Sequence, residues 1–160
     1  MDNFKELVDL LIEKKMTIAS AESCTGGLFA ASIVDVPDAS KVLNASVITY
    51  SNEAKTKYAH VNPELIEKYG AVSEQVAMAM AEGIAKETNA NVGVSFSGIA
   101  GPTGGTPEKP VGTVCIGLYV DGARECETLH LNENWTRSEI RTASVNLVAE
   151  KVIAFLKNNS

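Results

Sequence analysis

A serine, a lysine and a glycine-rich stretch lie in loops after three predicted strands, and together they could support nucleophilic catalysis. Ser23 lies in the segment Glu22–Gly27, where a predicted strand turns into a helix, so its hydroxyl can project above a sheet. The helix N-terminus that follows offers free N–H groups to an oxyanion or a phosphate. Position alone leaves open that Ser23 or Thr25 only caps this helix. Cys24 is the rival nucleophile, although a thiol at a strand end is more often a small buried hydrophobic group.

A serine hydroxyl needs a base that removes its proton. The two histidines, His60 and His130, lie outside the three loops, so the sequence does not favour a Ser-His-Asp triad. Lys55 is the alternative base, because Ser-Lys pairs use a lysine whose pKa is lowered by burial or by nearby positive charge. Tyr50, at the end of the preceding strand, could orient this lysine or relay the proton. From the residues alone, a solvated surface position for Lys55 stays open.

The third loop, Gly98–Gly105, has four glycines in eight residues and could turn several backbone N–H groups toward one anion. It matches neither a Walker A sequence nor GxGxxG, so it predicts a cradle for a monophosphate or a carboxylate rather than for a dinucleotide. A flexible lid is the alternative interpretation. Arg137 and Arg141 share a face of the last predicted helix and could clamp a phosphate, or else pair with surface acids such as Glu139.

The predicted elements bring these loops to one edge of a sheet. Branched and apolar runs predict strands over residues 17–21, 42–50, 92–97, 113–120 and 123–131, the last two forming a hairpin that turns at Asp121-Gly122. Helical spacing and cap signals predict helices over residues 3–14, up to about 34, over 52–58, and after Asn62, Ser73 and Thr136. Helices between the early strands favour parallel pairing. We therefore expect a three-layer α/β/α sandwich on a mixed, mostly parallel sheet of five or six strands.

The inward faces of three helices follow from the same spacing. They are Phe4, Leu7, Val8 and Leu11 in the first helix, Val76, Ala77, Met80, Ala81 and Ile84 in the helix after Ser73, and Ile140, Ala143, Leu147, Val148 and Phe155 in the last helix.

Composition excludes several other classes of function. The chain has 160 residues, which fits one domain, and its net charge is −6 with no run of Lys and Arg, so nucleic-acid binding is the weakest hypothesis. Three cysteines with irregular spacing and two histidines favour neither a disulfide framework nor a metal site. The charged amphipathic N-terminus does not match a signal peptide, and no run reaches the ~20 apolar residues of a membrane helix. We therefore expect a protein of the cytoplasm that does not bind membranes.

Five motifs, in this order, resemble the CinA C-terminal domain family over roughly residues 4–156. They are Ala21-Glu22-Ser23-Cys24-Thr25-Gly26-Gly27, Thr49-Tyr50-Ser51-Asn52-Glu53-Ala54-Lys55, Gly70-Ala71-Val72-Ser73, Ser97-Gly98-Ile99-Ala100-Gly101-Pro102 and Lys109-Pro110-Val111-Gly112-Thr113-Val114. Stand-alone members of this family, the PncC type, hydrolyse the carboxamide of nicotinamide mononucleotide to nicotinate mononucleotide and ammonia in pyridine nucleotide salvage. The resemblance implies Ser23, Lys55 and Tyr50 as the catalytic set.

The resemblance also carries expectations about ligands and assembly. It implies a CinA-type fold, no metal or other cofactor, and a homodimer or higher homo-oligomer, and we expect a single amidase domain over residues 1–160. Substrate contacts are expected at Thr25, Gly26, Gly27, Gly98, Gly101, Thr103, Gly104 and Arg141. Some family members are linked to DNA uptake or damage response. A non-catalytic nucleotide-binding accessory protein of the same fold, and an amidase for another small amide, therefore stay open as alternatives.

Overall fold

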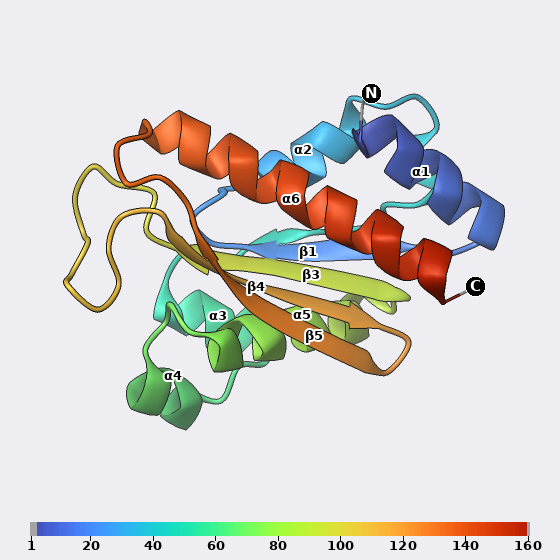
Figure 1. Ribbon diagram of the computed structural model, residues 1–160. Coiled ribbons are helices and arrows are strands. Elements are labelled where there is room, and N and C mark those ends of the chain that lie inside the picture. The colour runs from blue at the N-terminus through green and yellow to red at the C-terminus, as the bar shows by residue number, and fades with distance from the viewer. Residues whose placement is uncertain (1–2, 160) are drawn as a thin grey trace.

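The structure, a computed structural model, describes residues 3–159, which form three layers with helices on both faces of one sheet (Figure 1). The strands are β1 (Ile18–Glu22), β2 (Val47–Ile48), β3 (Val92–Gly98), β4 (Thr113–Val120) and β5 (Ala123–His130). The helices are α1 (Asn3–Lys14), α2 (Leu28–Val34), α3 (Asn52–Ala59), α4 (Pro63–Tyr69), α5 (Glu74–Thr88) and α6 (Arg137–Asn158), with a 3₁₀ turn at Ala39–Lys41. Helices α1, α2 and α6 cover one face of the sheet, and α3, α4 and α5 lie on the other. The predicted three-layer architecture is confirmed.

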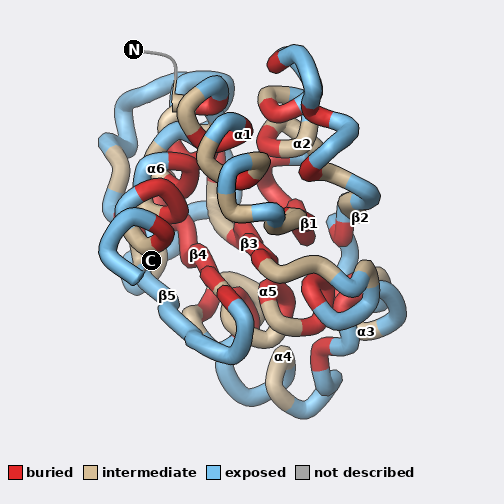
Figure 2. The backbone as a smooth tube through the Cα atoms, turned by 90° about the vertical axis from the view of Figure 1, so that its right-hand side faces the viewer, coloured by how far each residue is buried: buried red, intermediate tan, exposed pale blue. Residues whose placement is uncertain are grey.

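Within the described residues the sheet has five strands in the order β2-β1-β3-β4-β5. β1 pairs in parallel with β2 and β3, whereas β4 pairs antiparallel with β3 and β5. Only β4 therefore runs against the other described strands, and the mixed, mostly parallel sheet is as predicted. β4 and β5 form the predicted hairpin, and both turn residues, Asp121 and Gly122, have positive φ, as a tight hairpin turn requires. The central strands are buried, whereas the edge strand β5 is largely exposed (Figure 2).

The strand predicted over residues 42–50 is much shorter than expected, because β2 comprises only Val47–Ile48. Just before β2, the backbone N–H of Ser20 in β1 donates to the side-chain Oγ of Ser46 at 3.0 Å rather than to a backbone carbonyl. A side chain that accepts from a strand N–H competes with regular pairing. The predicted length was therefore wrong: the segment meets β1 at Val42 and Leu43, opposite Ile18, and pairs with it again only at β2.

Each face of the sheet has its own hydrophobic core, because side chains alternate along the strands. In β1, Ile18 packs into the core beneath α1, α2 and α6, whereas Ala19 and Ala21 pack into the core beneath α3, α4 and α5. The inward faces predicted for α1 and α5 are buried as expected. For α6 the prediction was partly right, because Ile140 and Val148 are buried while Ala143, Leu147 and Phe155 are half-buried.

The difference on α6 lies in which line of its residues faces the sheet. Its buried face is centred on a neighbouring line of residues, namely Val145, Ala149, Val152, Ile153 and Leu156.

Among residues 3–159, no helix combines the length and the apolar character that a membrane crossing requires.

Four helices begin at the cap residues that the sequence indicated. The side chains of Ser51, Asn62, Ser73 and Thr136 each accept a hydrogen bond from a backbone N–H in the first turn of α3, α4, α5 and α6, and Thr136 completes a capping box with Glu139. The start of α2 is different, because its cap position is Gly27. The N–H groups of Phe29 and Ala30 donate instead to the carboxylate of Glu22. Helix α2 is thus capped by Glu22 and not by a hydroxyl of the Ser23 segment.

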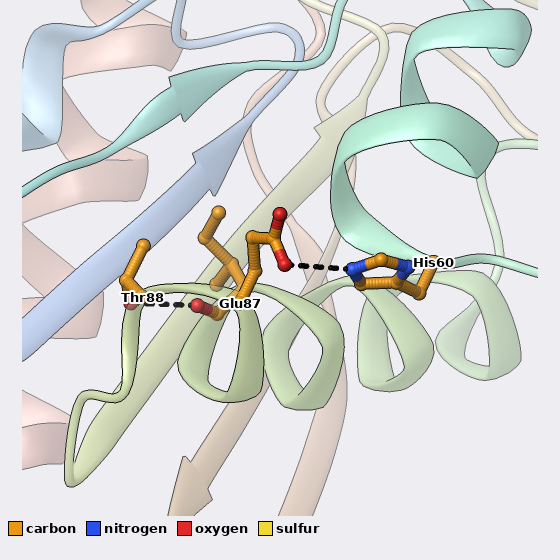
Figure 3. A network of polar contacts seen from close by, with 4 residues as sticks. His60, Glu87 and Thr88 are labelled. Carbon is orange, nitrogen blue, oxygen red and sulfur yellow. Dashed lines mark hydrogen bonds and ion pairs between the residues drawn. The ribbon is translucent and has the colours of Figure 1, made fainter.

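Helix α3, which carries Lys55, rests on α5 through a very close backbone contact. A Cβ atom placed on Gly83 of α5 would lie 1.6 Å from the carbonyl oxygen of Ala59, the last residue of α3. Beside this contact, His60 Nε2 lies 3.1 Å from a carboxylate oxygen of Glu87, and Thr88 donates to a backbone carbonyl of α5 (Figure 3). The packing of α3 against α5 fixes the height of Lys55 above the sheet.

We expect Gly83→Ala to lower the free energy of unfolding by at least about 2 kcal/mol, because the added methyl forces α3 away from α5. Helix propensity alone predicts the opposite sign, since alanine is normally better than glycine inside a helix by about 0.5–1 kcal/mol. Urea denaturation measures the change, with Gln75→Ala on the exposed side of α5 as the control. A stabilised Gly83→Ala protein would contradict the close contact.

Candidate functional site

The three polar loops converge at the carboxyl ends of β1, β2 and β3, as predicted for an open α/β sheet. They surround a pocket of about 280 Å³. The residues that line it are Ser23, Cys24, Tyr50, Asn52, Lys55, Ala71, Val72, Ser97, Gly98, Ile99, Ala100, Thr103, Gly104 and Arg137. The pocket has a polar end with a serine and a lysine, and walls of small apolar side chains.

Ser23 lies at the first residue beyond β1, where its backbone N–H donates to the carbonyl of Phe96 at 3.0 Å. Its side chain lines the pocket and is 9% exposed. The Oγ atom lies 3.2 Å from Lys55 Nζ and 3.5 Å from the backbone oxygen of Tyr50. The hydroxyl is therefore reachable from the pocket and in contact with an amine.

Lys55 is almost completely buried, with 2% of its surface exposed, so the solvated surface position left open by the sequence is wrong. Its Nζ lies within hydrogen-bond distance of Ser23 Oγ and donates to the Tyr50 carbonyl at 3.1 Å. Burial lowers the pKa of the Lys55 ammonium, against the opposing effects of Cys24 and the Glu53 carboxylate. A lowered pKa increases the fraction of neutral amine, which is the form that can accept a proton from a hydroxyl.

Cys24 also lines the pocket, but its environment favours the unreactive thiol. Its side chain is 7% exposed, and burial raises the pKa of the thiol to about 12, although Arg141 and Arg137 act in the opposite direction. The thiolate is the nucleophilic form of cysteine. At neutral pH the Cys24 sulfur is therefore a small buried apolar group, and Ser23 is the better nucleophile in the pocket.

Tyr50 contributes its backbone rather than its phenol to the Ser-Lys pair. The side chain is 61% exposed, and its hydroxyl accepts a hydrogen bond from Arg137 at 3.2 Å. A single atom of Tyr50, its backbone carbonyl oxygen, contacts both Lys55 Nζ and Ser23 Oγ. The structure thus places the Tyr50 hydroxyl on the outer rim of the pocket, beside an arginine.

The glycine-rich third loop forms part of the pocket wall. Gly98, Thr103 and Gly104 line the pocket, as the substrate-contact prediction requires. Gly101 lies outside the lining, and its carbonyl accepts a hydrogen bond from Arg137 at 2.7 Å. At Gly98 a Cβ atom would meet the carbonyl oxygen of Thr113 at 2.7 Å, so this glycine also permits close packing of the loop on β4.

Four residues predicted to contact substrate, namely Thr25, Gly26, Gly27 and Arg141, lie outside the pocket lining. Thr25 is fully buried, while Gly26 and Gly27 have positive φ and form the turn into α2. Arg141 donates to the carbonyl oxygens of Cys24 and Thr25 at 3.1 and 2.7 Å, so its guanidinium supports the loop and does not face the pocket. The neighbouring turn of α6 presents Arg137 to the pocket, and a substrate contact for Arg141 stays a prediction.

Three features of the site were missing from the sequence-based prediction of contacts. Arg137 lines the pocket; the sequence offered it together with Arg141 as a phosphate clamp, but only Arg141 was among the expected substrate contacts. Ala71 and Val72 form a wall, and Lys109 holds their loop by donating to the carbonyls of Tyr69 and Val72. The motifs around residues 70–73 and 109–114 were signals for this wall, although they carried no assigned role.

The histidines do not join the site. His60 directly follows α3 and lies beside Glu87 on the surface, and His130 is exposed at the end of β5. Among the described residues, no three His, Cys, Asp or Glu side chains gather in a way that could hold a metal ion.

Comparison with known proteins agrees with this fold. The CinA C-terminal domain family matches residues 2–156. A CinA-like protein of Dictyoglomus thermophilum is 52% identical over 136 residues, covering 85% of this chain and 33% of that protein. The crystal structure of the competence/damage inducible protein CihA from Agrobacterium tumefaciens is 36% identical with a TM-score of 0.89, covering 97% of this chain and 96% of that one.

A second crystal structure, the competence damage-inducible protein A (ComA) from Klebsiella pneumoniae, is 28% identical with a TM-score of 0.94, covering 99% of this chain and 97% of that one. The chain spans about a third of the length of the curated relatives that it matches. In two examples the match covers 35% and 33% of the relative's sequence. The matched residues include the whole pocket and every strand of the sheet. The chain therefore belongs to the CinA C-terminal domain family.

Proposed function

We propose that this chain is an amidohydrolase that converts nicotinamide mononucleotide and water to nicotinate mononucleotide and ammonia through an acyl-enzyme on Ser23. The observation that carries the proposal is the buried Lys55 amine, 3.2 Å from the Ser23 hydroxyl at the polar end of a pocket. A lysine in this position can act as the base that histidine supplies in other serine hydrolases. Family membership adds support, because the resemblance implies Ser23 and Lys55 as catalytic residues of the amidase members.

In the first half of the reaction, neutral Lys55 accepts the Ser23 proton while Oγ attacks the carboxamide carbon. The negative charge that develops on the carbonyl oxygen needs hydrogen-bond donors. Cys24 and Ala100 line the pocket, and within residues 3–159 their backbone N–H groups donate to no other residue, so they are the candidate donors. The Lys55 ammonium then returns the proton to the amide nitrogen, the C–N bond breaks, and ammonia leaves.

In the second half, water attacks the ester that joins the nicotinoyl group to Ser23. Lys55, neutral again, accepts a proton from this water, and the tetrahedral intermediate collapses to nicotinate mononucleotide. The proton on Lys55 returns to Ser23 Oγ, which restores the starting pair. The Tyr50 carbonyl, which accepts from Lys55 at 3.1 Å, keeps the amine aimed at Ser23 through both halves.

Another part of the pocket lining suits the phosphate of the nucleotide. Arg137 lines the pocket at the start of α6, and Thr103 and Gly104 line it from the glycine-rich loop. A guanidinium and a loop of backbone N–H groups are the groups that proteins use for a phosphate. Binding energy from the phosphate can position the distant carboxamide against Ser23.

We expect Arg137→Ala to raise KM for nicotinamide mononucleotide about tenfold to a hundredfold, the usual range for losing one charge-assisted hydrogen bond. KM for nicotinamide riboside, which lacks the phosphate, should hardly change. Arg141→Ala should instead lower the unfolding midpoint, because two loop carbonyls lose their donor. Steady-state ammonia release with both substrates measures the first effect. A selective rise of KM in Arg141→Ala rather than Arg137→Ala would return the phosphate contact to Arg141.

The proposed function is tested directly by ammonia release from nicotinamide mononucleotide, with product identity checked by mass spectrometry. Release of one ammonia per nicotinate mononucleotide is the expected result. Calorimetric binding of the nucleotide without product would indicate the non-catalytic accessory protein. Turnover of other small amides with similar kcat/KM would indicate a broader amidase.

A further inference from the structure

We propose that Glu22 is a positioning residue for Ser23, whose buried carboxylate holds the turn after β1 so that the serine faces Lys55. This inference rests on the proposed function, in which Ser23 is the nucleophile. Glu22 is the last residue of β1 and directly precedes Ser23 in the chain. It lies outside the pocket lining and so has no contact with a substrate there.

The Glu22 carboxylate is completely buried and accepts four hydrogen bonds. One oxygen accepts from Thr25 Oγ1 at 2.7 Å and from the Phe29 N–H at 2.9 Å. The other accepts from Ser20 Oγ at 2.8 Å and from the Ala30 N–H at 3.0 Å. Two bonds on each oxygen fill the acceptor sites of an ionised carboxylate.

This arrangement ties the residues on both sides of Ser23 to fixed parts of the fold. Before Ser23, the chain is held in β1. After Ser23, Thr25 is held by its hydroxyl to Glu22 and by its carbonyl to Arg141 of α6. Only Cys24 lies between Ser23 and this anchor. Ser23 therefore occupies a short turn whose two ends cannot move independently, although the turn itself belongs to no helix or strand.

A buried carboxylate is a costly way to hold a turn, because charge is unfavourable in an apolar interior. Hydroxyls cap the starts of α3, α5 and α6, and the side chain of Asn62 caps α4. Helix α2 differs from these four helices, because the acceptor for its first N–H groups is Glu22, in the strand that directly precedes Ser23. One carboxylate oxygen of Glu22 accepts from both the Phe29 N–H and Thr25 Oγ1. This shared acceptor couples α2 to the turn that contains Ser23.

The test uses three variants, two of which each remove one hydroxyl that donates to the Glu22 carboxylate. Thr25→Val removes the bond that reaches past Ser23, and Ser20→Ala, the matched control, removes the bond on the β1 side. Phenylmethanesulfonyl fluoride reports on Ser23 without a nicotinamide substrate, since sulfonylation forms an Oγ–S bond and releases fluoride. We expect Thr25→Val and Glu22→Gln to slow sulfonylation of Ser23 at least tenfold, and Ser20→Ala to stay within threefold of wild type. Intact-mass and peptide analysis follow the reaction.

A second readout separates positioning from general loss of stability. With nicotinamide mononucleotide, Thr25→Val should lower kcat at least tenfold while KM stays within threefold, because the phosphate contacts lie elsewhere. All rates are taken well below the unfolding midpoint of each variant. A variant that is only less stable would show a lower midpoint with normal rates per folded molecule, and that result would overturn the proposal. Equal slowing by Ser20→Ala would overturn it as well.

The outcomes for wild type keep the two proposals apart. If wild type is sulfonylated at Ser23 but releases no ammonia, the assigned substrate is wrong, while the labelling rates of the variants still decide the role of Glu22. If wild type turns over the nucleotide and no variant changes the rate at which Ser23 is sulfonylated, the proposed function stands and the role of Glu22 is rejected. If Ser23 resists the reagent and no ammonia appears, both proposals fall together.

Discussion

Ser23→Ala is expected to reduce ammonia release from nicotinamide mononucleotide by about 10⁴-fold or more, which is the size of loss found when serine hydrolases lose their nucleophile. The side chain of Ser23 lies 3.2 Å from Lys55 Nζ, and no covalent intermediate can form without it. Binding of the nucleotide should survive, because the phosphate contacts do not involve Ser23. Single-turnover ammonia release and calorimetry measure the two effects on the same preparation.

The matched control for this variant is Ser32→Ala. It removes the same atom from a half-buried serine of α2, where the hydroxyl donates to the Leu28 carbonyl at 2.7 Å, away from the pocket. Turnover should remain close to wild type in this control. Near-normal turnover in Ser23→Ala would show that the nucleophile is wrongly assigned and that the chemistry needs another group or a directly activated water.

Lys55→Met is expected to abolish turnover to a similar degree, because methionine fills the same space and accepts no proton. Lys55→Arg should fail as well, since a guanidinium does not lose its proton in proteins. Lys57→Met, in the same helix but exposed, is the control and should keep wild-type turnover. An active Lys55→Met enzyme would remove lysine from the mechanism.

The pH dependence of wild type follows from the same residue. Burial lowers the pKa of Lys55 below its ordinary value of 10.5, and the neutral amine is the active form. The value of kcat/KM should therefore rise with pH through the Lys55 pKa and level off above it. A profile that falls over this range would mean that the ammonium is the active form.

The stability contributed by Lys55 should change with pH in the same direction as activity. In the unfolded chain the pKa of Lys55 is near 10.5, whereas in the fold it is lower. Between these two pKa values the unfolded state binds more protons than the folded state. The stability that this group contributes therefore rises with pH in that window. Below that window the cost of the buried charge is at its greatest. Lys55→Met removes this cost, so at pH 7 the variant should unfold at no lower temperature than wild type.

The helices were predictable because their signals are local. Ser51, Asn62, Ser73 and Thr136 each cap a helix through bonds to residues two or three positions ahead, and such contacts do not depend on the rest of the fold. The length of β2 was not predictable in this way. It depends on Ser46 meeting Ser20 across the sheet, which the branched residues around it do not reveal.

The site was predictable at the level of loops and less so at the level of side chains. Ser23 and Lys55 converge because parallel strands end at the same edge. Which arginine faces the pocket depends on the rotation of α6 about its axis, and two arginines four residues apart give the same pattern in a sequence. Glu22 was missed as a structural residue because an acid at a strand end is usually exposed, whereas here four donors from three segments surround it.

The two members of the Ser-Lys pair are anchored with unequal strength. Ser23 follows a buried inner strand, and the turn that holds it is tied to α2 and α6, whereas Lys55 lies on an eight-residue helix beyond the two-residue strand β2. Segments with few pairing partners open locally before a protein melts as a whole. Warming should therefore separate amine from hydroxyl while circular dichroism still reports an intact fold, so that heat inactivation precedes denaturation. The temperature at which activity is lost would then depend on local opening at the sheet edge that carries Lys55 and not on unfolding of the core.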